Sequence, residues 1–490
     1  MHNSRLNTRP GRQTGAISKR FWRGDDAGLP LRTTRQVPPA PVRFVAGWAL
    51  FFFCLTLLFY YPGSLSWDPT VQWYEARLAV VTSQHPPFMS FVWHWLDLVI
   101  QGPGLFLALE LAVFWLATGL LFVHLQAPKR LVIVGDVFLA ANPFLMAHSA
   151  LVIKDVIGGN LALAAFAVLI GYPRYKIRSI AIALSFALLA LAGLMRYQLW
   201  VLTVPALASI FVFDAAAGKP AKSERVRQTA IALVALLVPI VAAEPAMRAT
   251  FDLRPSYLDV GLRQAMIYDI AAVLAKSPDV SLSTFSDLGI DVEALRARAA
   301  AEYTPYSVAS LMKPGGVIDM MEPVSGPNIR KQWTDLIAQV PGDLLVHRVT
   351  AFLHLLGIGD VYACWPLDTV GFLGRPVDKW QALNGASLKE AYATHLLGAP
   401  LFPAGTFLFR PITYLVLSVG LFTFWLCKKD TSAIFSCGMI AGAWIYWLTF
   451  APMPLSCDVR YSYFPCAATL FAGLAWVVMM LTGERPAVAR

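Results

Sequence analysis

Long apolar runs separated by short polar segments make up most of this chain. A helix needs about 20 mostly apolar residues to cross the hydrocarbon core of a bilayer. About ten runs have this character, at 42–61, 104–125, 131–149, 156–171, 179–195, 198–213, 229–246, 407–427, 432–450 and 464–482. The pattern predicts an all-α polytopic membrane protein with about ten transmembrane helices.

The long stretch 247–406 interrupts these runs. It contains turn-forming sequences such as the one from Lys313 to Gly316, so we expect a small, mostly helical extracytoplasmic domain. The expected organisation is a basic, disordered cytoplasmic tail (1–41), helices one to seven (42–246) with a long outer loop (62–103), the extracytoplasmic domain (247–406), helices eight to ten (407–482) and a cytoplasmic tail (483–490). The outer loop is amphipathic and rich in tryptophan, which predicts surface helices.

Basic residues predict the orientation of the helices. Lys and Arg are enriched in short cytoplasmic loops. If the N-terminus is cytoplasmic, the cytoplasmic tails and links hold most of the basic residues outside 247–406. The short outer loops then hold only Arg77, Lys154, Arg196, Arg410 and Arg460. We therefore expect both termini inside and loop 62–103 outside.

Composition excludes a soluble protein. The chain is 57% hydrophobic and 14% charged, whereas soluble domains are about a quarter charged. The net charge of +10 does not indicate nucleic-acid binding, because the basic residues lie in links that face anionic lipid and no nucleic-acid reading motif is present. The first apolar run starts too late and is too long for a cleaved signal peptide, so we interpret it as an anchor.

Candidate chemistry gathers at the outer ends of the helices. Under this topology the outer loops carry Asp68, His85, Lys154, Asp155, Arg196, Asp458, Arg460 and Tyr461. Ionisable groups at membrane depth are costly, so a cluster of them indicates either contact with solvent or a functional site.

The order of these residues resembles the GT-C superfamily of membrane glycosyltransferases, in particular bacterial relatives of the protein O-mannosyltransferases. The resemblance lies in Asp68 shortly after the first helix, the surface-helical loop with His85-Pro86-Pro87, and the late outer sequence from Asp458 to Tyr461. Lys154-Asp155 matches the second outer loop of bacterial members. One departure is that Pro69, and not a second acid, follows Asp68; the next acid is Glu75.

The resemblance implies transfer of a sugar from a polyprenyl-phosphate-linked donor to an envelope lipid, glycan or protein acceptor. The reaction would take place at the outer face of a membrane, which we expect to be the bacterial inner membrane. A carboxylate near the membrane surface can take the proton of the acceptor hydroxyl, and Asp68 is the candidate base, with Asp155 as a second catalytic residue. The candidate substrate-binding residues are Arg196, Arg460, Lys154, His85, Asp458 and Tyr461, since fixed cations stabilise the departing phosphate.

Each of these residues also has a simpler interpretation. Asp68 can be a turn residue at a helix end, and Arg196, Arg460 and Lys154 can extend to the interface beside their helices. No cofactor is certain. Asp68, Asp155 and Asp458 offer the oxygen ligands that Mg²⁺ or Mn²⁺ prefers, so a divalent cation is an open alternative. Cys364 and Cys457 both fall outside and a bridge between them is open.

Two other functional classes remain in view. A lipid or small-solute transporter would place polar residues near the bilayer midplane on broken helices, whereas here they lie at the outer ends. A non-catalytic scaffold for envelope assembly would tolerate Asp68→Asn. The sequence does not name the sugar or the acceptor.

The topology can be tested by labelling single introduced cysteines in intact cells, in a background without reactive native cysteines. A membrane-impermeant reagent should label a cysteine that replaces Ser325 and spare one that replaces Ser223 until the cells are permeabilised. The reverse pattern would place every candidate residue in the wrong compartment.

Overall fold

The computed structural model describes residues 38–81, 85–218, 222–253, 257–277, 279–359, 364, 407–427 and 431–482. Almost all regular structure in these ranges is helical, as expected where lipid offers the backbone no hydrogen-bond partners. Six of the described helices are long and apolar enough to cross a membrane, or seven if a bent pair counts as one span. The chain is an all-α polytopic membrane protein; the count of ten spans stays a prediction.

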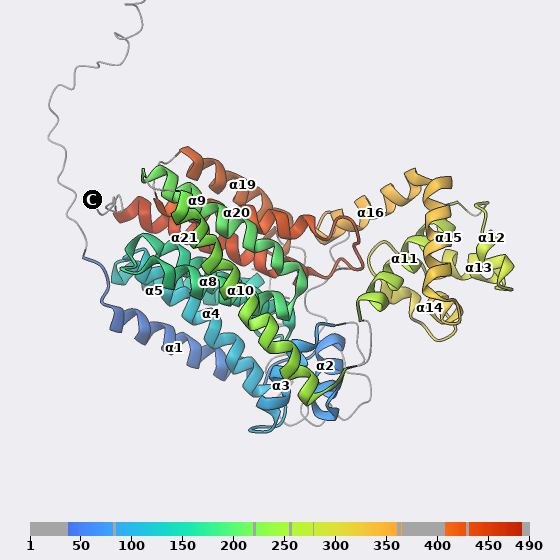
Figure 1. Cartoon of the computed structure of the whole chain (residues 1–490), viewed down its shortest axis with the longest axis horizontal. Coiled ribbons are helices and arrows are strands. Elements are labelled where there is room, and N and C mark those ends of the chain that lie inside the picture. The colour runs from blue at the N-terminus through green and yellow to red at the C-terminus, as the bar shows by residue number, and fades with distance from the viewer. Residues whose placement is uncertain are drawn as a thin grey trace, which may run out of the picture. The chain divides into compact units, whose positions relative to one another are not determined.

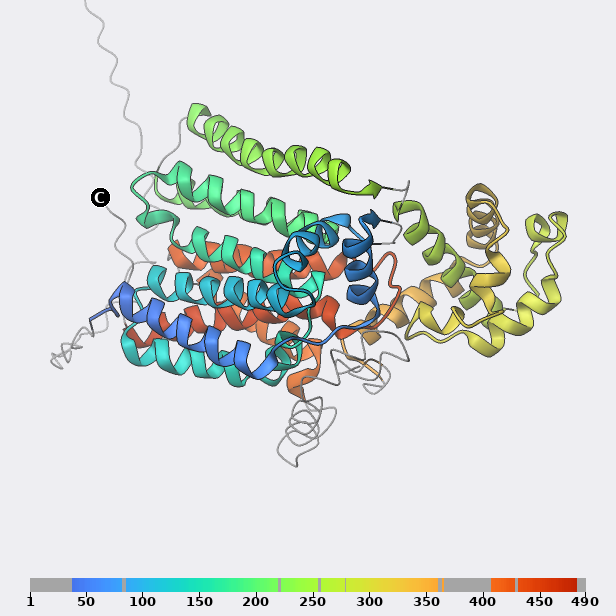
Figure 2. The same ribbon diagram turned by 90° about the horizontal axis from the view of Figure 1, so that it is seen from below.

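Helices occupy all ten of the predicted apolar runs (Figure 1). The bundle consists of α1 (Val42–Tyr60), α4 (Gly104–His124), α5 (Lys129–Ala141), α6 (Pro143–Ser149), α7 (Lys154–Ile170), α8 (Arg178–Met195), α9 (Thr203–Ala216), α10 (Lys222–Thr250), α19 (Pro411–Cys427), α20 (Thr431–Leu448) and α21 (Tyr463–Thr482). In Figure 2 the light green α10 lies at the edge of the bundle, beside α8. Short 3₁₀ turns are η1 (Tyr172–Arg174), η2 (Tyr197–Leu202), η5 (Phe407–Phe409) and η6 (Val459–Ser462).

Several predicted helices differ in detail from the structure. The run 131–149 is not one straight helix, because α5 and α6 meet at a bend of 67°. Pro143 cannot donate a backbone hydrogen bond, and the side chain of Asn142 caps the new helix by accepting from Leu145 N. The run 198–213 begins in η2, and α10 extends beyond the predicted 229–246 at both ends.

Helix α7 is the centre of the bundle. Every one of its residues is buried, and it packs against α4, α8, α20 and α21. Two small residues allow close approach: a Cβ at Gly158 would lie 2.7 Å from Leu199 Cδ1, and a Cβ at Gly159 would lie 2.8 Å from Tyr463 Cδ1. Small residues at helix contacts are the usual means of tight packing in membranes, where lipid removes the hydrophobic advantage of burial.

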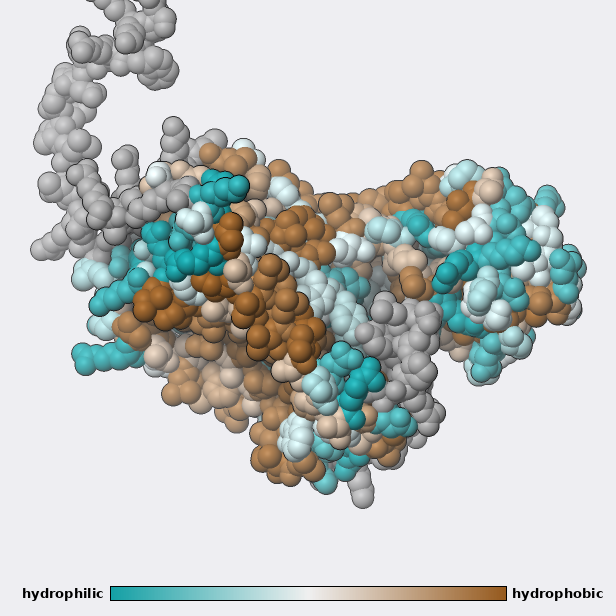
Figure 3. Space-filling view, viewed as in Figure 1, coloured by the Kyte–Doolittle hydropathy of each residue, from teal (hydrophilic) through white to brown (hydrophobic). Residues whose placement is uncertain are grey.

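The outside of the bundle is apolar. On α1, Leu50, Phe51, Leu58 and Phe59 are all more than half exposed. Such a surface is typical of contact with lipid. Figure 3 shows hydrophobic side chains over the bundle and hydrophilic ones over α11–α15.

Residues 62–103 contain two helices, α2 (Trp67–Leu78) and α3 (Pro87–Asp97). Asp97 holds them together by accepting from Trp73 Nε1 at 2.8 Å and from Gly102 N at 2.7 Å. A short parallel pair joins β1 (Val80–Val81) to β2 (Asp252–Leu253), just after α10. The two helices expected in this loop are therefore present, and their position on a membrane surface stays a prediction.

The described residues between Tyr257 and Leu355 form a second group of helices. They are α11 (Tyr257–Lys276), α12 (Ser283–Asp287), α13 (Val292–Glu302), η3 (Val308–Leu311), α14 (Val317–Met321), α15 (Gly326–Gln339) and α16 (Pro341–Leu355). Residues of α11–α15 form a hydrophobic core of their own. An antiparallel bridge between Ser307 and Ser456 and a disulfide between Cys364 and Cys457 connect this group to the segment before η6. The pairing that the sequence left open is thus present. Residues 365–406, the tail 1–37 and residues 483–490 lie outside the described residues.

Candidate functional site

The candidate site lies where four segments meet: the start of α2, the residues before α3, the start of α7, and η6. A parallel bridge sets two of them side by side, because Ser64 N donates to Ala150 O at 2.6 Å and Val152 N donates to Ser64 O at 3.0 Å. Ser64 precedes α2 and Val152 precedes α7. The first turns of these helices, with Asp68 and Lys154, are therefore neighbours.

Asp68 is the centre of the site. Its Oδ2 lies 3.2 Å from Lys154 Nζ and 2.8 Å from an Arg460 guanidinium nitrogen. Its Oδ1 lies 3.5 Å from His85 Nε2. The side chains are largely buried, with Asp68 19%, Arg460 11% and Lys154 6% exposed. Asp68 also lies in the first turn of α2, where the helix dipole favours a negative charge.

Two charges decide the protonation of Asp68. Burial alone would raise the pKa of Asp68, but the positive charges of Arg460 and Lys154 outweigh burial and hold this pKa well below its ordinary value. Asp68 is therefore a carboxylate at physiological pH.

His85 is neutral beside this carboxylate. Its Nδ1 lies 3.0 Å from Lys154 Nζ; because an ammonium group can only donate, Nδ1 accepts and Nε2 carries the proton. Burial, followed by the charge of Lys154, lowers the pKa of His85 to about 3. His85 thus presents an N–H toward Asp68 without adding a charge.

A second ion pair is more completely buried than the pair of Asp68 and Arg460. Arg196, which ends α8, contacts Asp155, and both side chains are almost fully buried. The guanidinium carbon of Arg196 also lies 4.4 Å from the ring centre of Tyr461 and 5.3 Å from that of Phe450. These two rings stack with centres 5.1 Å apart. Arg196 is thus held on several sides by the protein itself.

Asp458 orients Arg460. An Oδ2 of Asp458 lies 2.6 Å from Arg460 Nε, and its Oδ1 accepts from Arg460 N at 3.2 Å, which caps η6. Burial raises the pKa of Asp458 above its ordinary value, against the lowering effect of Arg460. The loop before it is held from outside the bundle, because Cys457 N donates to Tyr306 O at 2.8 Å.

The structure brings all eight candidate residues into one connected cluster. The charges balance: the carboxylates of Asp68, Asp155 and Asp458 face the cations of Lys154, Arg196 and Arg460, and His85 is neutral. Buried ions need such partners. A bound anion would therefore have to compete for, or share, cations that are already paired.

The sequence did not reveal Phe450, whose ring lies 5.3 Å from the guanidinium carbon of Arg196, or the hydrogen-bonded pair Asn160 and Tyr463. Each looked like an ordinary position within or beside an apolar run. Glu75, the next acid after Asp68, lies two turns further along α2, where it accepts from Ser90 Oγ of α3 at 3.3 Å. It therefore helps to join α2 to α3.

Three carboxylates could hold the divalent cation that the sequence leaves open, and each of them has a basic partner. Asp68, Asp155 and Asp458 are each paired with a lysine or arginine, whose charge would repel Mg²⁺ or Mn²⁺ from the same place. Within the part of the chain that the structure describes, no group of three or more His, Cys, Asp and Glu side chains is placed to hold a metal ion.

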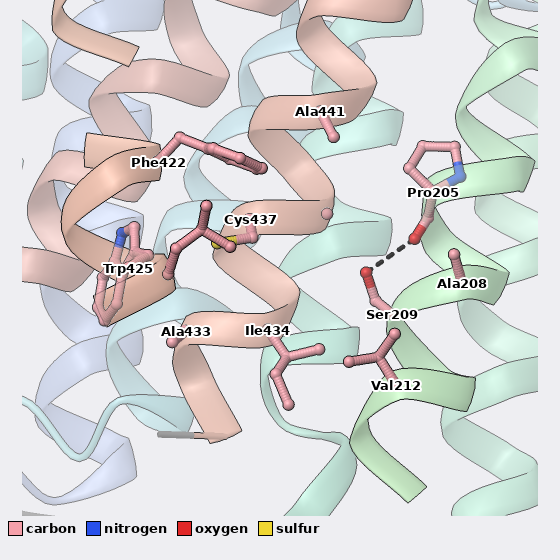
Figure 4. Close-up of a pocket in the computed structure, with 12 residues that line it drawn as sticks. Pro205, Ala208, Ser209, Val212, Phe422, Trp425, Ala433, Ile434, Cys437 and Ala441 are labelled. Atoms are coloured by element: carbon pink, nitrogen blue, oxygen red, sulfur yellow. Dashed lines mark hydrogen bonds between the residues drawn. The ribbon is translucent and has the colours of Figure 1, made fainter. Parts of the chain in front are cut away.

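A separate cavity of about 320 Å³ lies between α9, α19 and α20 (Figure 4). Apolar side chains such as Val212, Phe422 and Ile434 line it, and the hydroxyl of Ser209 is turned to Pro205 O, to which it donates at 2.7 Å. None of the eight candidate residues lines this cavity, so it is distinct from the charged site.

Comparison with known proteins gives one distant similarity. No family model and no curated protein sequence matches this chain. Among solved structures, the chain is similar to the archaeal oligosaccharyltransferase AglB from Archaeoglobus fulgidus, in complex with an inhibitory peptide and a dolichol-phosphate, with a TM-score of 0.39 and 13% sequence identity. The match covers 89% of this chain and 51% of that one, so the chain spans about half the length of that protein. This likeness assigns no role to any residue here.

The protonation of the site can be measured directly. Infrared difference spectra between wild type and Asp68→Asn should show an ionised Asp68 from pH 5 to 8, because Arg460 and Lys154 lower its pKa. In a Lys154→Met background the titration of Asp68 should move to higher pH, because one of the two cations is lost. The band that is lost in Asp458→Asn should titrate at higher pH than the band of Asp68, since burial raises the pKa of Asp458. A protonated Asp68 band in wild type at pH 7 would contradict this account.

Proposed function

We propose that this protein is a membrane glycosyltransferase that moves a sugar from a polyprenyl-phosphate-linked donor to an acceptor at the outer face of a membrane. The observation that supports the proposal best is one ionised carboxylate, Asp68, held between two buried cations: Lys154 at the start of α7 and Arg460 at the start of the apolar span Val459–Thr482. A lipid-linked donor would present its phosphate at this depth, and an acceptor would approach from outside.

The two cations suit the leaving phosphate. When the bond from the sugar to the phosphate breaks, negative charge develops on the phosphate oxygens, and fixed cations in a water-poor site stabilise that charge. Lys154 and Arg460 already converge on one oxygen of Asp68. A phosphate that shares them would sit beside the carboxylate.

Donor binding prepares Asp68 to act as the base. In the free site the cations hold its pKa so low that it is a weak proton acceptor. A phosphate would take part of the cations' charge and add negative charge nearby, and both effects raise the pKa of a carboxylate. Asp68 would then be able to take the proton of the acceptor hydroxyl when the donor is in place.

Arg196 and Asp155 form a buried ion pair next to Asp68, Lys154 and Arg460 and do not contact the phosphate in this proposal. Arg196 is engaged by Asp155 and lies over Tyr461, so we assign it to positioning the ring and the loop of Arg460. The same ring lies 5.2 Å from the Arg460 guanidinium carbon. We assign the phosphate contact to Lys154 and Arg460, and not to Arg196, because Lys154 and Arg460 contact the same oxygen of Asp68.

We propose that the acceptor is an envelope lipid, glycan or protein. We expect the reaction to take place at the outer face of a bacterial inner membrane, which follows from the predicted orientation of the helices.

Asp68→Asn keeps the shape of the side chain but cannot accept a proton. With purified protein and a polyprenyl-phosphate sugar, transfer should fall by about 10²- to 10⁴-fold, the usual contribution of a general base. Donor affinity should stay equal or become tighter, because Lys154 and Arg460 lose a competing carboxylate. Normal transfer by this variant would remove Asp68 from the mechanism and favour the scaffold alternative.

Measurements of donor affinity can distinguish the proposed phosphate ligands, Lys154 and Arg460, from Arg196. Lys154→Met and Arg460→Met should each weaken donor binding by about 10- to 100-fold, as expected for the loss of one charge-assisted hydrogen bond. Arg196→Met should mainly lower the melting temperature, because it leaves Asp155 buried without a partner, and adding Asp155→Asn should restore much of that stability.

The matched control for these cations is Arg248→Gln. Arg248 makes an exposed ion pair with Glu244 and should change neither property. Donor binding unaffected by both Lys154→Met and Arg460→Met would place the phosphate elsewhere.

A further inference from the structure

The two cations that face Asp68 come from different helices. Lys154 is the first residue of α7, and Arg460 lies in η6, which leads directly into α21. A phosphate can contact both only if each cation lies within hydrogen-bond distance of one of its oxygens, about 2.7 to 3.2 Å. The packing of α7 against α21 therefore bears on the distance between these two cations.

Asn160 makes such a contact. Its side chain is buried in α7 with 1% exposed, its Nδ2 donates to the backbone oxygen of Glu110 in α4 at 3.0 Å, and its Oδ1 accepts from Tyr463 Oη in α21 at 2.6 Å. The amide orientation is fixed, because a backbone carbonyl can only accept. One side chain thus joins three helices.

The hydrogen bond between Asn160 and Tyr463 lies about two turns from Lys154 along α7 and one turn from Arg460 along the chain. Asn160 is six residues after Lys154, which is about 9 Å along a helix, and Tyr463 is three residues after Arg460. Gly159 leaves room for the ring of Tyr463, since a Cβ there would lie 2.8 Å from Tyr463 Cδ1. The tyrosine therefore packs directly on the helix that carries Lys154.

We infer that the hydrogen bond between Asn160 and Tyr463 sets the spacing of Lys154 and Arg460, and that both are positioning residues for the donor phosphate. This inference rests on the proposed function. A merely structural role would be to satisfy a polar amide inside an apolar bundle. The two roles differ in what they change: positioning controls donor affinity, whereas a structural role controls how much folded protein is present.

Tyr463→Phe removes only the hydroxyl. In full-length purified protein it should weaken binding of undecaprenyl phosphate, and raise KM for a polyprenyl-phosphate sugar, by about 5- to 30-fold, the range expected for one buried hydrogen bond. The turnover number and the KM for the acceptor should stay within about twofold. Asn160→Ser, too short to reach Tyr463, should give the same result by a second route.

The matched control is Tyr172→Phe. Tyr172 is also fully buried and also donates from its hydroxyl, here to Asp214 at 3.1 Å, but it follows the opposite end of α7. This variant should keep the wild-type donor affinity even if its melting temperature falls. An equal loss of affinity in both tyrosine variants would show a general effect of loosening the bundle and would overturn the inference.

A double-mutant cycle gives the sharper test. If Tyr463 acts by placing Lys154 opposite Arg460, then Tyr463→Phe should cause little further loss of donor affinity in a Lys154→Met background. Full additivity would overturn the inference, as would wild-type affinity in both Tyr463→Phe and Asn160→Ser, while leaving the proposed function intact. A wild-type protein that neither binds undecaprenyl phosphate nor uses any polyprenyl-phosphate sugar would overturn the proposed function, and the inference with it.

Discussion

The pairing of Asp68 with Lys154 and Arg460 is the constraint on which the rest of the site depends. A carboxylate that is only 19% exposed is unfavourable unless cations compensate its charge, and each buried cation in turn needs a partner. Satisfying these charges requires the starts of α2 and α7 and the turn η6 to meet at one point. The same pairing that makes the fold specific here also leaves two cations where a phosphate would need them.

The membrane bundle makes this meeting possible by packing closely around α7. Gly158 lets η2 pack closely against α7, and Gly159 does the same for α21. Next to Gly159, Asn160 accepts a hydrogen bond from Tyr463 of α21. In lipid, where burial of apolar surface favours no particular helix pair, small residues and buried hydrogen bonds decide which helices associate. The helix with the least contact with lipid is therefore the one that presents Lys154 and Asp155.

The segment that carries Arg460 is held from both sides. Within the bundle, Trp447 Nε1 donates to Ser462 Oγ at 3.0 Å; outside it, Val308 N donates to Leu455 O at 2.8 Å and Cys457 is bonded to Cys364. A short loop between two such anchors loses little further entropy when Arg460 is ordered. The helices α11–α16 therefore contribute to the site through the backbone they hold, without placing a charged side chain against Asp68 among the described residues.

The sequence by itself determined the helical class, the positions of the apolar runs and the list of candidate residues, because run length and polar residues at helix ends are local properties. It did not determine the break at Asn142, where one proline and one capping side chain divide a uniform apolar run. Nor did it show that Lys154, and not Arg196, shares the carboxylate of Asp68 with Arg460, or that Asn160 joins α7 to α21. Asp68 and Arg460 are 392 residues apart in the chain. Their partners are decided by which helices pack together, and this depends on the fit of many side chains at once.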